Sequence, residues 1–133
     1  MRKRIRDYGI IIGKHRPGAL NKITDVPGVQ VGHATVDTED HKTGVTVILP
    51  CEDNSFVNKL TAAAYVHNGF GKTTGTLQIA ELGTLETPIA LTNTLNVGLV
   101  QDALVDYMIT KCRAEKVQVS TVTPLWGSAT TAS

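Results

Sequence analysis

Cysteine and long apolar runs are both scarce in this sequence, and each scarcity excludes a class of protein. The two cysteines, Cys51 and Cys112, stand far apart, without the spacing of a metal site or of a disulfide framework. A reducing cytoplasm is therefore the expected location. No apolar run reaches the roughly 18 residues that a membrane span requires. The apolar stretch that follows the basic N-terminus covers only residues 10–12, which is too short for a signal peptide.

A strong excess of charge of either sign is also missing. The 13 Lys and Arg residues nearly balance the 12 Asp and Glu residues, and the formal net charge of +1 favours no nucleic-acid partner. With 133 residues, of which 41% are hydrophobic and 19% charged, the chain is typical of one globular domain or a piece of a larger one. A short basic cluster at the N-terminus is interpreted as a solvated chain end; it contains Arg2, Lys3, Arg4 and Arg6.

The apolar pattern predicts strands and two helices. β-Branched and alternating stretches predict strands at 29–36, 44–49, 87–92 and 117–122, with Pro124 ending the last one. Residues 37–43 are expected to form a charged surface turn, and residues 61–67 fit a short strand or a helix. A helix is expected at 76–82, ended by Gly83.

The second helix has the clearest periodicity in the chain. Apolar side chains recur at helical spacing, and Asn96 is the expected N-cap; the apolar positions are Val97, Val100, Leu104, Met108 and Cys112. A run of strands followed by strand, helix and strand predicts an α/β fold in which this helix covers one face of a sheet.

The stretch VHNGFGKTTGT, residues 66–76, raises the question of a phosphate-binding loop. The pattern G-x-x-x-x-G-K-[ST] requires glycine at residue 66, where the chain has Val66, and a β-branched residue suits that tight turn poorly. The threonines after Lys72 also begin a helix weakly. A glycine-rich turn is the better interpretation, although nucleotide binding stays a weak third hypothesis for the chain.

Catalytic and metal-ligating patterns are sparse. The four histidines show no pairing that would build a metal site, and no serine lies in G-x-S-x-G; the histidines are His15, His33, His41 and His67. Asn54-Ser55 is similar to an Asn–Ser self-cleavage junction, but its acidic neighbours favour an ordinary turn in a surface loop. No cofactor or metal is expected.

Four stretches carry a family resemblance. ITDVPGVQVGH (23–33), GVTVILP (44–50), NGFGKTTGT (68–76) and TPIALTNTLNVG (87–98) together resemble the DmpA-type aminopeptidases of peptidase family S58. This family contains L-aminopeptidase/D-esterases and β-peptidyl aminopeptidases. The resemblance extends from about residue 4 to about residue 124, and four motifs in order argue against the phosphate-binding loop.

The resemblance implies a fold and an activity. Members are precursors that cut themselves, and the new N-terminal serine is the nucleophile that releases N-terminal residues from small peptides, amides or esters. The implied fold is an αββα four-layer sandwich, of which this chain would be the N-terminal part, and members form homo-oligomers. Asn68, Gly69, Asn93 and Thr94 would support the active-site loops of the complete enzyme. Simple turn and capping chemistry is the alternative for Asn93 and Thr94.

The chain also departs from the family pattern. The segment with the self-cleavage site and the nucleophile is absent, so no residue of this chain is expected to be catalytic. Beyond Pro124 the family continues with an acidic residue that receives the substrate's amino group and, in some members, an aromatic hydroxyl. Ser128 and Thr130 occupy those positions.

Two domain-level expectations follow. Residues 1–124 would form a partial S58-like domain, and 125–133 a divergent, unstructured tail. The chain would be inactive alone, or it would be a non-catalytic binding or assembly module.

Overall fold

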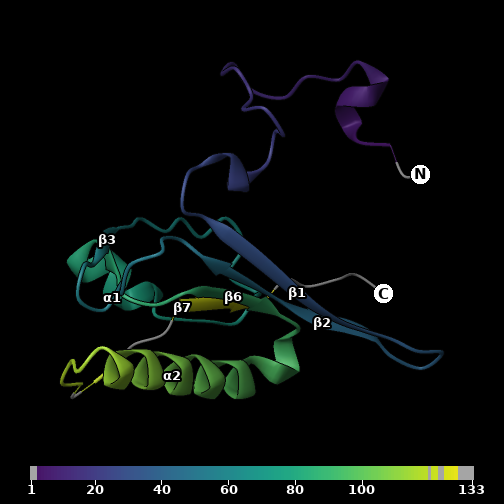
Figure 1. Ribbon diagram of the computed structural model, residues 1–133. Helices are drawn as coiled ribbons and strands as arrows, with labels where there is room; N and C mark the ends of the chain where they lie inside the picture. The colour runs from purple at the N-terminus through teal and green to yellow at the C-terminus, as the bar shows by residue number, and fades with distance from the viewer. Residues whose placement is uncertain (1–2, 120, 123–124, 129–133) are drawn as a thin grey trace.

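The chain folds around one five-stranded sheet with a long helix against it (Figure 1). The computed structural model describes residues 3–119, 121–122 and 125–128. The strand order is β1-β2-β6-β7-β4, and β3 pairs with β5 in a separate two-stranded sheet. The strands are β1 (Gln30–Asp37), β2 (Lys42–Leu49), β3 (Leu60–Thr61), β4 (Thr73–Thr74), β5 (Thr84–Leu85), β6 (Ile89–Thr92) and β7 (Leu125–Ser128); the helices are α1 (Thr76–Leu82) and α2 (Val97–Ala114), with short 3₁₀ helices η1 (Ile5–Tyr8), η2 (Ile23–Asp25) and η3 (Thr94–Asn96).

A long antiparallel hairpin forms one edge of the sheet. β1 and β2 pair over eight positions, from Gln30 opposite Leu49 to Asp37 opposite Lys42, so the predicted turn shrinks to residues 38–41. An ion pair between Lys42 and Asp37 closes the hairpin tip. Gly44 is required by the close approach of the strands, because a Cβ at this position would lie 2.4 Å from the Ala34 carbonyl oxygen.

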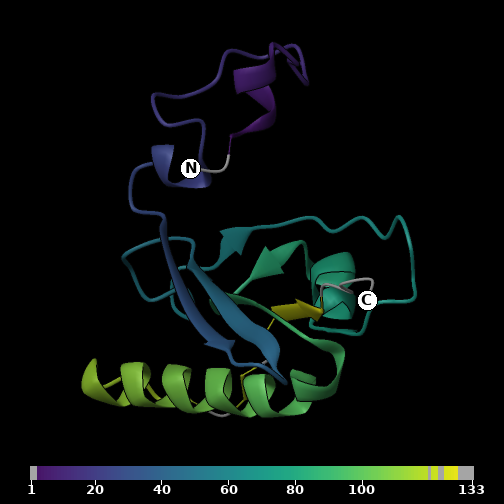
Figure 2. The same cartoon turned by 90° about the vertical axis from the view of Figure 1, so that its right-hand side faces the viewer.

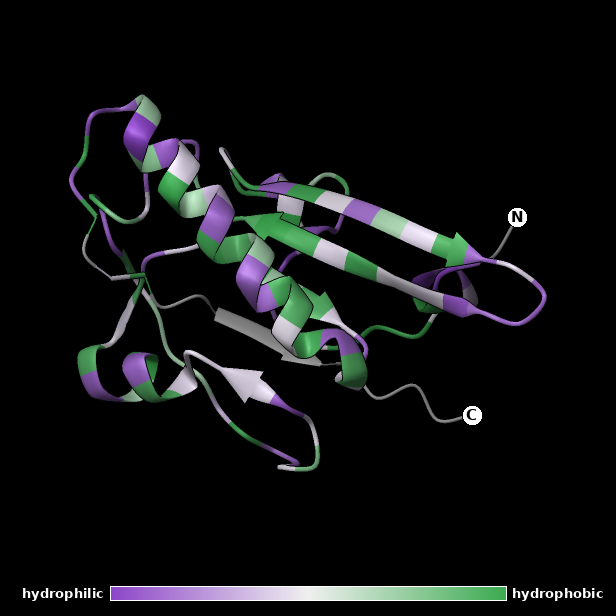
Figure 3. Ribbon diagram, turned by 90° about the horizontal axis from the view of Figure 1, so that it is seen from below, coloured by the Kyte–Doolittle hydropathy of each residue, from purple (hydrophilic) through white to green (hydrophobic). Residues whose placement is uncertain are grey.

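Helix α2 makes the core of the sheet–helix unit. Leu104, Met108 and Cys112 are buried, as the helical spacing predicted, and Leu104 packs with Ala90 of β6. Seen from below, α2 lies across the sheet, and apolar and polar bands alternate along it (Figure 3). The predicted fold class, α/β with the helix on one sheet face, is therefore confirmed.

The end of α2 forms a Schellman motif at an unusual residue. The Val117 N–H donates to the Cys112 carbonyl (2.8 Å), and the Lys116 N–H donates to the Arg113 carbonyl (3.1 Å). Lys116 occupies the left-handed position, with φ 58°, where glycine is the usual residue.

Helix α1 has the predicted bounds. Gly83 adopts the left-handed conformation (φ 65°) and its N–H donates to the Ile79 carbonyl, which ends the helix as expected. The ambiguous stretch at 61–67 contributes only the end of β3, and β4 and β5 were not predicted. Each of these strands has two residues, which is too short to give a periodic signal.

The prediction for the C-terminal region was wrong in two ways. The described residues between 117 and 122 form no strand, and the sheet receives β7 (Leu125–Ser128) instead. β7 runs parallel to β6, so β6, α2 and β7 form one crossover unit. Residues 125–128 are therefore not an unstructured tail. Pro124, which was predicted to end a strand, lies outside the described residues. Residues 129–133, with Thr130, lie outside the described part.

The N-terminal residues form a separate arm. Residues 3–29, which we call the arm, contain η1 and η2 and stand away from the sheet on the side opposite α2 (Figures 1 and 2). The Arg4 guanidinium donates to the Leu20 and Asn21 carbonyls (2.9 and 2.7 Å), which closes the arm on itself. The rest of the chain is called the body.

Candidate functional site

The candidate site lies at one end of the sheet, where β6 and β7 finish side by side. Their parallel register pairs Thr92 with Ser128, and the antiparallel β4 begins beside them with Thr73 opposite Gly127. We call this region the sheet end. The loop after β6 and the loop before β4 both lie at this end, and such carboxyl ends of parallel strands are the usual ligand-binding edge of α/β folds.

Asn93 organises the loop that follows β6. Its Oδ1 accepts hydrogen bonds from the N–H groups of Leu95 and Asn96 (both 3.1 Å), so it caps η3 at the entrance to α2. Its Nδ2 donates to Thr43 Oγ1 of β2 at 2.6 Å. Asn96 occupies the N-cap position of α2, as predicted, but its side chain makes no capping bond, and it is also the last residue of η3. The amide of Asn93 therefore ties the loop to the neighbouring strand.

A shallow pocket lies beside Asn93. It is bounded by residues of β2 and β6, among them Thr43, Gly44, Leu91 and Thr92. Thr94 is half-buried at the first position of η3. The polar atoms of the Asn93 side chain are all engaged within the chain, so its contribution to this pocket is to hold the loop in place.

The second pair of predicted residues, Asn68 and Gly69, lies in the exposed loop that leads into β4. Asn68 Oδ1 accepts from the Phe70 N–H (3.0 Å) and forms an Asx turn. Lys72 Nζ donates to the Phe70 carbonyl (3.3 Å) and lies 5.3 Å from the centre of the Phe70 ring. Lys72 thus contacts its own loop, which supports a glycine-rich turn rather than a phosphate-binding loop.

The two predicted pairs approach the sheet end from opposite sides of β7. β7 separates β4 from β6, so backbones on its two sides lie roughly 10 Å apart, twice the usual spacing of neighbouring strands. Asn68 accepts a hydrogen bond from the Phe70 N–H, whereas Asn93 bonds to Thr43 and to the N–H groups of the loop that follows it. The fold therefore places both loops at one end of the sheet without direct contact between these two residues.

The Asn54-Ser55 pair occupies a different environment from the surface loop that was predicted. Both residues are buried, with exposed fractions of 6% and 5%. Asn54 Nδ2 donates to Glu115 Oε2 (2.7 Å) and to Cys112 Sγ (3.4 Å), and Asn54 Oδ1 accepts from the Phe56 N–H. The surface location was wrong, but the turn interpretation is confirmed. The partners lie 58 and 61 residues away, so no local signal marks this burial.

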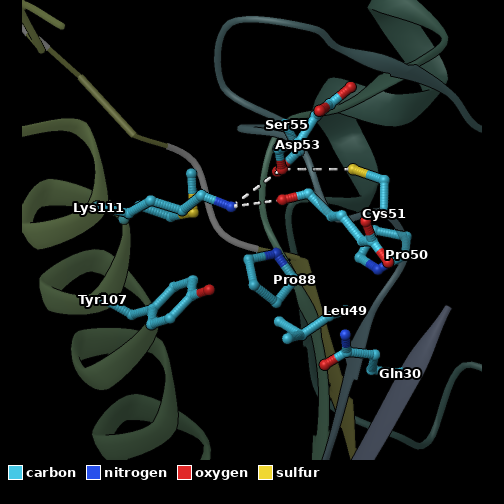
Figure 4. Close-up of a pocket in the computed structure, with 11 residues that line it drawn as sticks. Gln30, Leu49, Pro50, Cys51, Asp53, Ser55, Pro88, Tyr107 and Lys111 are labelled. Carbon is cyan, nitrogen blue, oxygen red and sulfur yellow. Dashed lines mark hydrogen bonds between the residues drawn. The ribbon is translucent and has the colours of Figure 1, made fainter. Parts of the chain in front are cut away.

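A pocket between this loop and α2 is shaped by Lys111 (Figure 4). Lys111 Nζ donates to the carbonyls of Glu52 and Asp53 (3.2 and 3.0 Å) and holds the loop against the helix. Cys51 Sγ lies 3.6 Å from the Asp53 carbonyl oxygen. Because the lysine is engaged with backbone oxygens, its role in this pocket is structural.

A buried carboxylate was missed by sequence reasoning. Glu86 is buried and pairs with Lys59, whose ammonium also lies 5.0 Å from the centre of the Phe56 ring. The pair connects the loop before β3 to the residue after β5. A single glutamate between an apolar residue and a threonine gives no sequence signal of burial.

The described residues contain no cluster of metal-binding side chains, and the one shifted pKa belongs to a residue of the arm. Within residues 3–119, 121–122 and 125–128, no three His, Cys, Asp or Glu side chains gather as a metal site would require. The N–H groups of Leu20 and Lys22 hold the pKa of Asp25 below its ordinary value, but Asp25 belongs to the arm. In the same described part, no helix is long and apolar enough to cross a membrane.

Comparison with known proteins identifies the family. The sequence profile of peptidase family S58 matches residues 21–131. This chain belongs to peptidase family S58. The resemblance inferred from the four motifs is therefore confirmed.

Two curated S58 relatives are β-peptidyl aminopeptidases. BapA of Sphingosinicella xenopeptidilytica is 42% identical over 121 residues, which cover 84% of this chain and 30% of that protein. BapA of Sphingosinicella microcystinivorans is 38% identical over 115 residues, which cover 79% and 28%. This S58 chain thus spans less than a third of the length of these curated relatives.

Three solved structures share the fold. The PH0078 protein from Pyrococcus horikoshii OT3 has a TM-score of 0.86 at 42% identity, and a Burkholderia sp. β-aminopeptidase has 0.83 at 43%. The L-aminopeptidase D-Ala-esterase/amidase from Ochrobactrum anthropi, described as a variant of the Ntn hydrolase fold, has 0.81 at 27%. Each match covers 96% of this chain and 36–38% of the solved chain.

Proposed function

We propose that this chain is the N-terminal part of an S58-type serine aminopeptidase that releases N-terminal residues from small peptides, amides or esters. The observation that carries the proposal is the family match over residues 21–131 in a chain that spans 28–38% of its relatives. Two of those relatives bear the name β-peptidyl aminopeptidase, and a third structure is described as a prototype of the serine aminopeptidases.

We assign the sheet end to the substrate side of the complete enzyme. The cap and cross-strand bond of Asn93 fix the loop after β6, and the Asx turn of Asn68 shapes the loop before β4. Rigid loops at the carboxyl ends of parallel strands suit substrate positioning. Asn68, Gly69, Asn93 and Thr94 are therefore proposed as supporting residues rather than as groups that react.

The same proposal includes inactivity of the isolated chain. The expected nucleophile is a serine whose own α-amino group acts as the base after self-cleavage. Ser55 does not fit this role, because it is 5% exposed and follows Asn54, which is held by Glu115 and Cys112. At position 128 an uncharged serine stands where the family pattern has an acid, so the charge for a substrate ammonium is lacking there.

The surroundings expected for the complete protein are also part of the proposal. Cys51 and Cys112 are free thiols, which suits a reducing cytoplasm. A homo-oligomer is proposed for the assembled enzyme, with small peptides, amides or esters as substrates and with neither nucleic acid nor membrane as a partner.

The direct test uses the purified chain alone. We expect no release of p-nitroaniline from aminoacyl-p-nitroanilides, including a β-alanyl substrate, and no loss of a segment from the intact mass on long incubation. A cut before Ser55 that appears in step with hydrolysis would contradict the proposal. Failure to complement a separately supplied C-terminal segment, combined with saturable binding of the peptide substrates, would favour a non-catalytic binding module.

Position 128 offers a sharper version of the test. In an assembly completed with the C-terminal segment of a relative, Ser128→Glu should lower KM for a substrate with a free amino group, because a carboxylate pairs with the ammonium. Ser128→Gln is the matched control, since it has the same shape without the charge. Equal kinetics for the two variants would place the ammonium elsewhere.

A further inference from the structure

Three asparagines among the described residues form the same turn with the residue two positions ahead. In each turn the side-chain carbonyl accepts a hydrogen bond from a backbone N–H at 3.0–3.1 Å; the pairs are Asn54 with Phe56, Asn68 with Phe70, and Asn93 with Leu95. Such an Asx turn folds the side-chain carboxamide back toward the peptide group that follows it. The three turns differ in what holds the carboxamide nitrogen, in exposure and in the next residue.

The carboxamide nitrogen is held in two of these turns. Asn54 Nδ2 donates to Glu115 Oε2 at 2.7 Å, and Asn93 Nδ2 donates to Thr43 Oγ1 at 2.6 Å. Within the part of the chain that the structure describes, Asn68 Nδ2 has no hydrogen-bond partner, although Asn68 Oδ1 has one. Of the three carboxamides, that of Asn68 is therefore the one whose nitrogen nothing in the described chain holds in place.

Exposure and the following residue also distinguish Asn68. It lies in the loop between β3 and β4, which projects from the sheets, and every residue from 63 to 70 is exposed (Figure 2). By contrast, Asn54 is buried and Asn93 is half-buried. Asn68 precedes Gly69, whereas none of the other five asparagines of the sequence precedes a glycine. Gly69 has no side chain that hinders approach to its nitrogen, and its N–H bonds to no described residue.

We propose that Asn68 is a modification site at which the chain converts its own asparagine to aspartate and isoaspartate. The Gly69 nitrogen attacks Cγ of Asn68, so that the N–Cγ bond forms and the Cγ–Nδ2 bond breaks. The departing nitrogen takes up the Gly69 proton and leaves as ammonia. Water then opens the cyclic imide: addition at Cγ gives aspartate, and addition at the backbone carbonyl carbon gives isoaspartate. Water is the only co-reactant.

The conversion changes both the charge and the backbone of the loop. Either product replaces a neutral carboxamide by a carboxylate, which lowers the formal net charge of the chain by one from +1. Aspartate keeps an acceptor for the Phe70 N–H, whereas isoaspartate lengthens the backbone by one methylene group before β4. That this loop borders the substrate rests on the proposed function; the conversion itself does not.

Ageing of the purified chain tests the conversion without a C-terminal segment and without any peptidase activity. The folded chain is incubated at neutral and at mildly alkaline pH, digested, and mapped by mass spectrometry. We expect the peptide that contains Asn68 to take on the mass of an acid in place of an amide and to separate into two products. The isoaspartate product should accept a methyl group from a protein isoaspartate methyltransferase. The rate should rise with pH, because the attacking nitrogen must lose its proton.

The other two Asx turns are the internal controls. Asn54 and Asn93 should keep their carboxamides in the folded chain, and Asn54 should do so even in Ser55→Gly, which gives this buried residue the same following glycine. Gly69→Ala should slow the conversion of Asn68 severalfold, because a Cβ hinders the attacking nitrogen. Conversion of Asn68 in urea but not in the folded chain would overturn the proposal. Conversion of Asn54 as fast as that of Asn68 in the folded chain would overturn it as well.

Discussion

The arm and the body differ in whether they bury apolar side chains. In the body, Leu104, Met108 and Cys112 of α2 are buried against the sheet, and long-range hydrogen bonds such as Asn54 to Glu115 tie distant segments together. In the arm, neither 3₁₀ helix buries a residue, and the bonds of Arg4 and Asp25 join arm residues to one another. The comparison teaches that the buried side chains which stabilise the described part of the chain lie in the body and not in the arm. Paired substitutions test this division.

The largest effect is expected from the core of α2. Leu104→Ala should lower the free energy of unfolding by about 2–5 kcal/mol, because it leaves a cavity under a side chain that is 5% exposed. Leu99→Ala, the same change on the outer face of the same helix, should cost no more than about 0.5 kcal/mol. Urea unfolding measures both. Equal costs would contradict the placement of α2.

The buried ion pair should give the second largest effect. Lys59→Met removes the cation beside the buried Glu86 and should cost about 2–3 kcal/mol, less than a fully buried pair because Lys59 is partly exposed. Lys42→Met removes the same cation from Asp37 at the exposed hairpin tip and should change stability by less than about 1 kcal/mol. A larger loss at Lys42 than at Lys59 in thermal unfolding would refute this ranking.

Strand packing in the hairpin gives a smaller contrast. Gly44→Ala should destabilise by about 1–3 kcal/mol, since its Cβ would meet the Ala34 carbonyl oxygen at 2.4 Å. At Gly32 of the partner strand nothing lies within 4 Å of an added Cβ, so Gly32→Ala should be tolerated. Chemical denaturation of the two variants distinguishes them, and equal behaviour would show that the strands lie farther apart than described.

The end of α2 should respond in the stabilising direction. Lys116→Gly should raise the free energy of unfolding by about 1 kcal/mol, because glycine adopts the left-handed conformation (φ 58°) without strain. Lys116→Ala keeps a Cβ and should give no gain. If alanine stabilises as much as glycine, the Schellman geometry is not the cause.

The smallest effect belongs to the arm and depends on pH. Backbone N–H groups lower the pKa of Asp25 from its ordinary value of 3.8, so its contribution is present above that pH and is lost as pH falls through the lowered pKa. The protection of the Leu20 and Lys22 amides, measured against their intrinsic exchange rates at each pH, should fall in that acid range, and Asp25→Asn should abolish the dependence. Unchanged exchange in the arm would remove Asp25 as its clamp.

Regular periodicity made α1, α2 and the hairpin predictable from sequence. The spacing of Leu104, Met108 and Cys112 specified the buried face of α2, and Gly83 marked the end of α1. β7 was missed because 117–122 is the more strand-like stretch. Short strands are assigned by their partners, and the parallel pairing with β6 is a tertiary effect that propensity does not contain.

The candidate site was only partly predictable for the same reason. Asn93 was expected at the loop after β6, but its bond to Thr43 joins residues 50 positions apart. Asn54 was expected at the surface because it follows Glu52 and Asp53, while Cys112 and Glu115 of α2 bury it. Polar residues with distant partners carry no local signature.

Complementation tests the central claim most directly. The chain is mixed or co-expressed with the C-terminal segment of the 43% identical Burkholderia sp. β-aminopeptidase, and hydrolysis of a β-alanyl-p-nitroanilide is followed. The account predicts activity only in the mixture, abolished when the serine at the N-terminus of the added segment is replaced by alanine. Hydrolysis by the isolated chain at the rate of the mixture would contradict it.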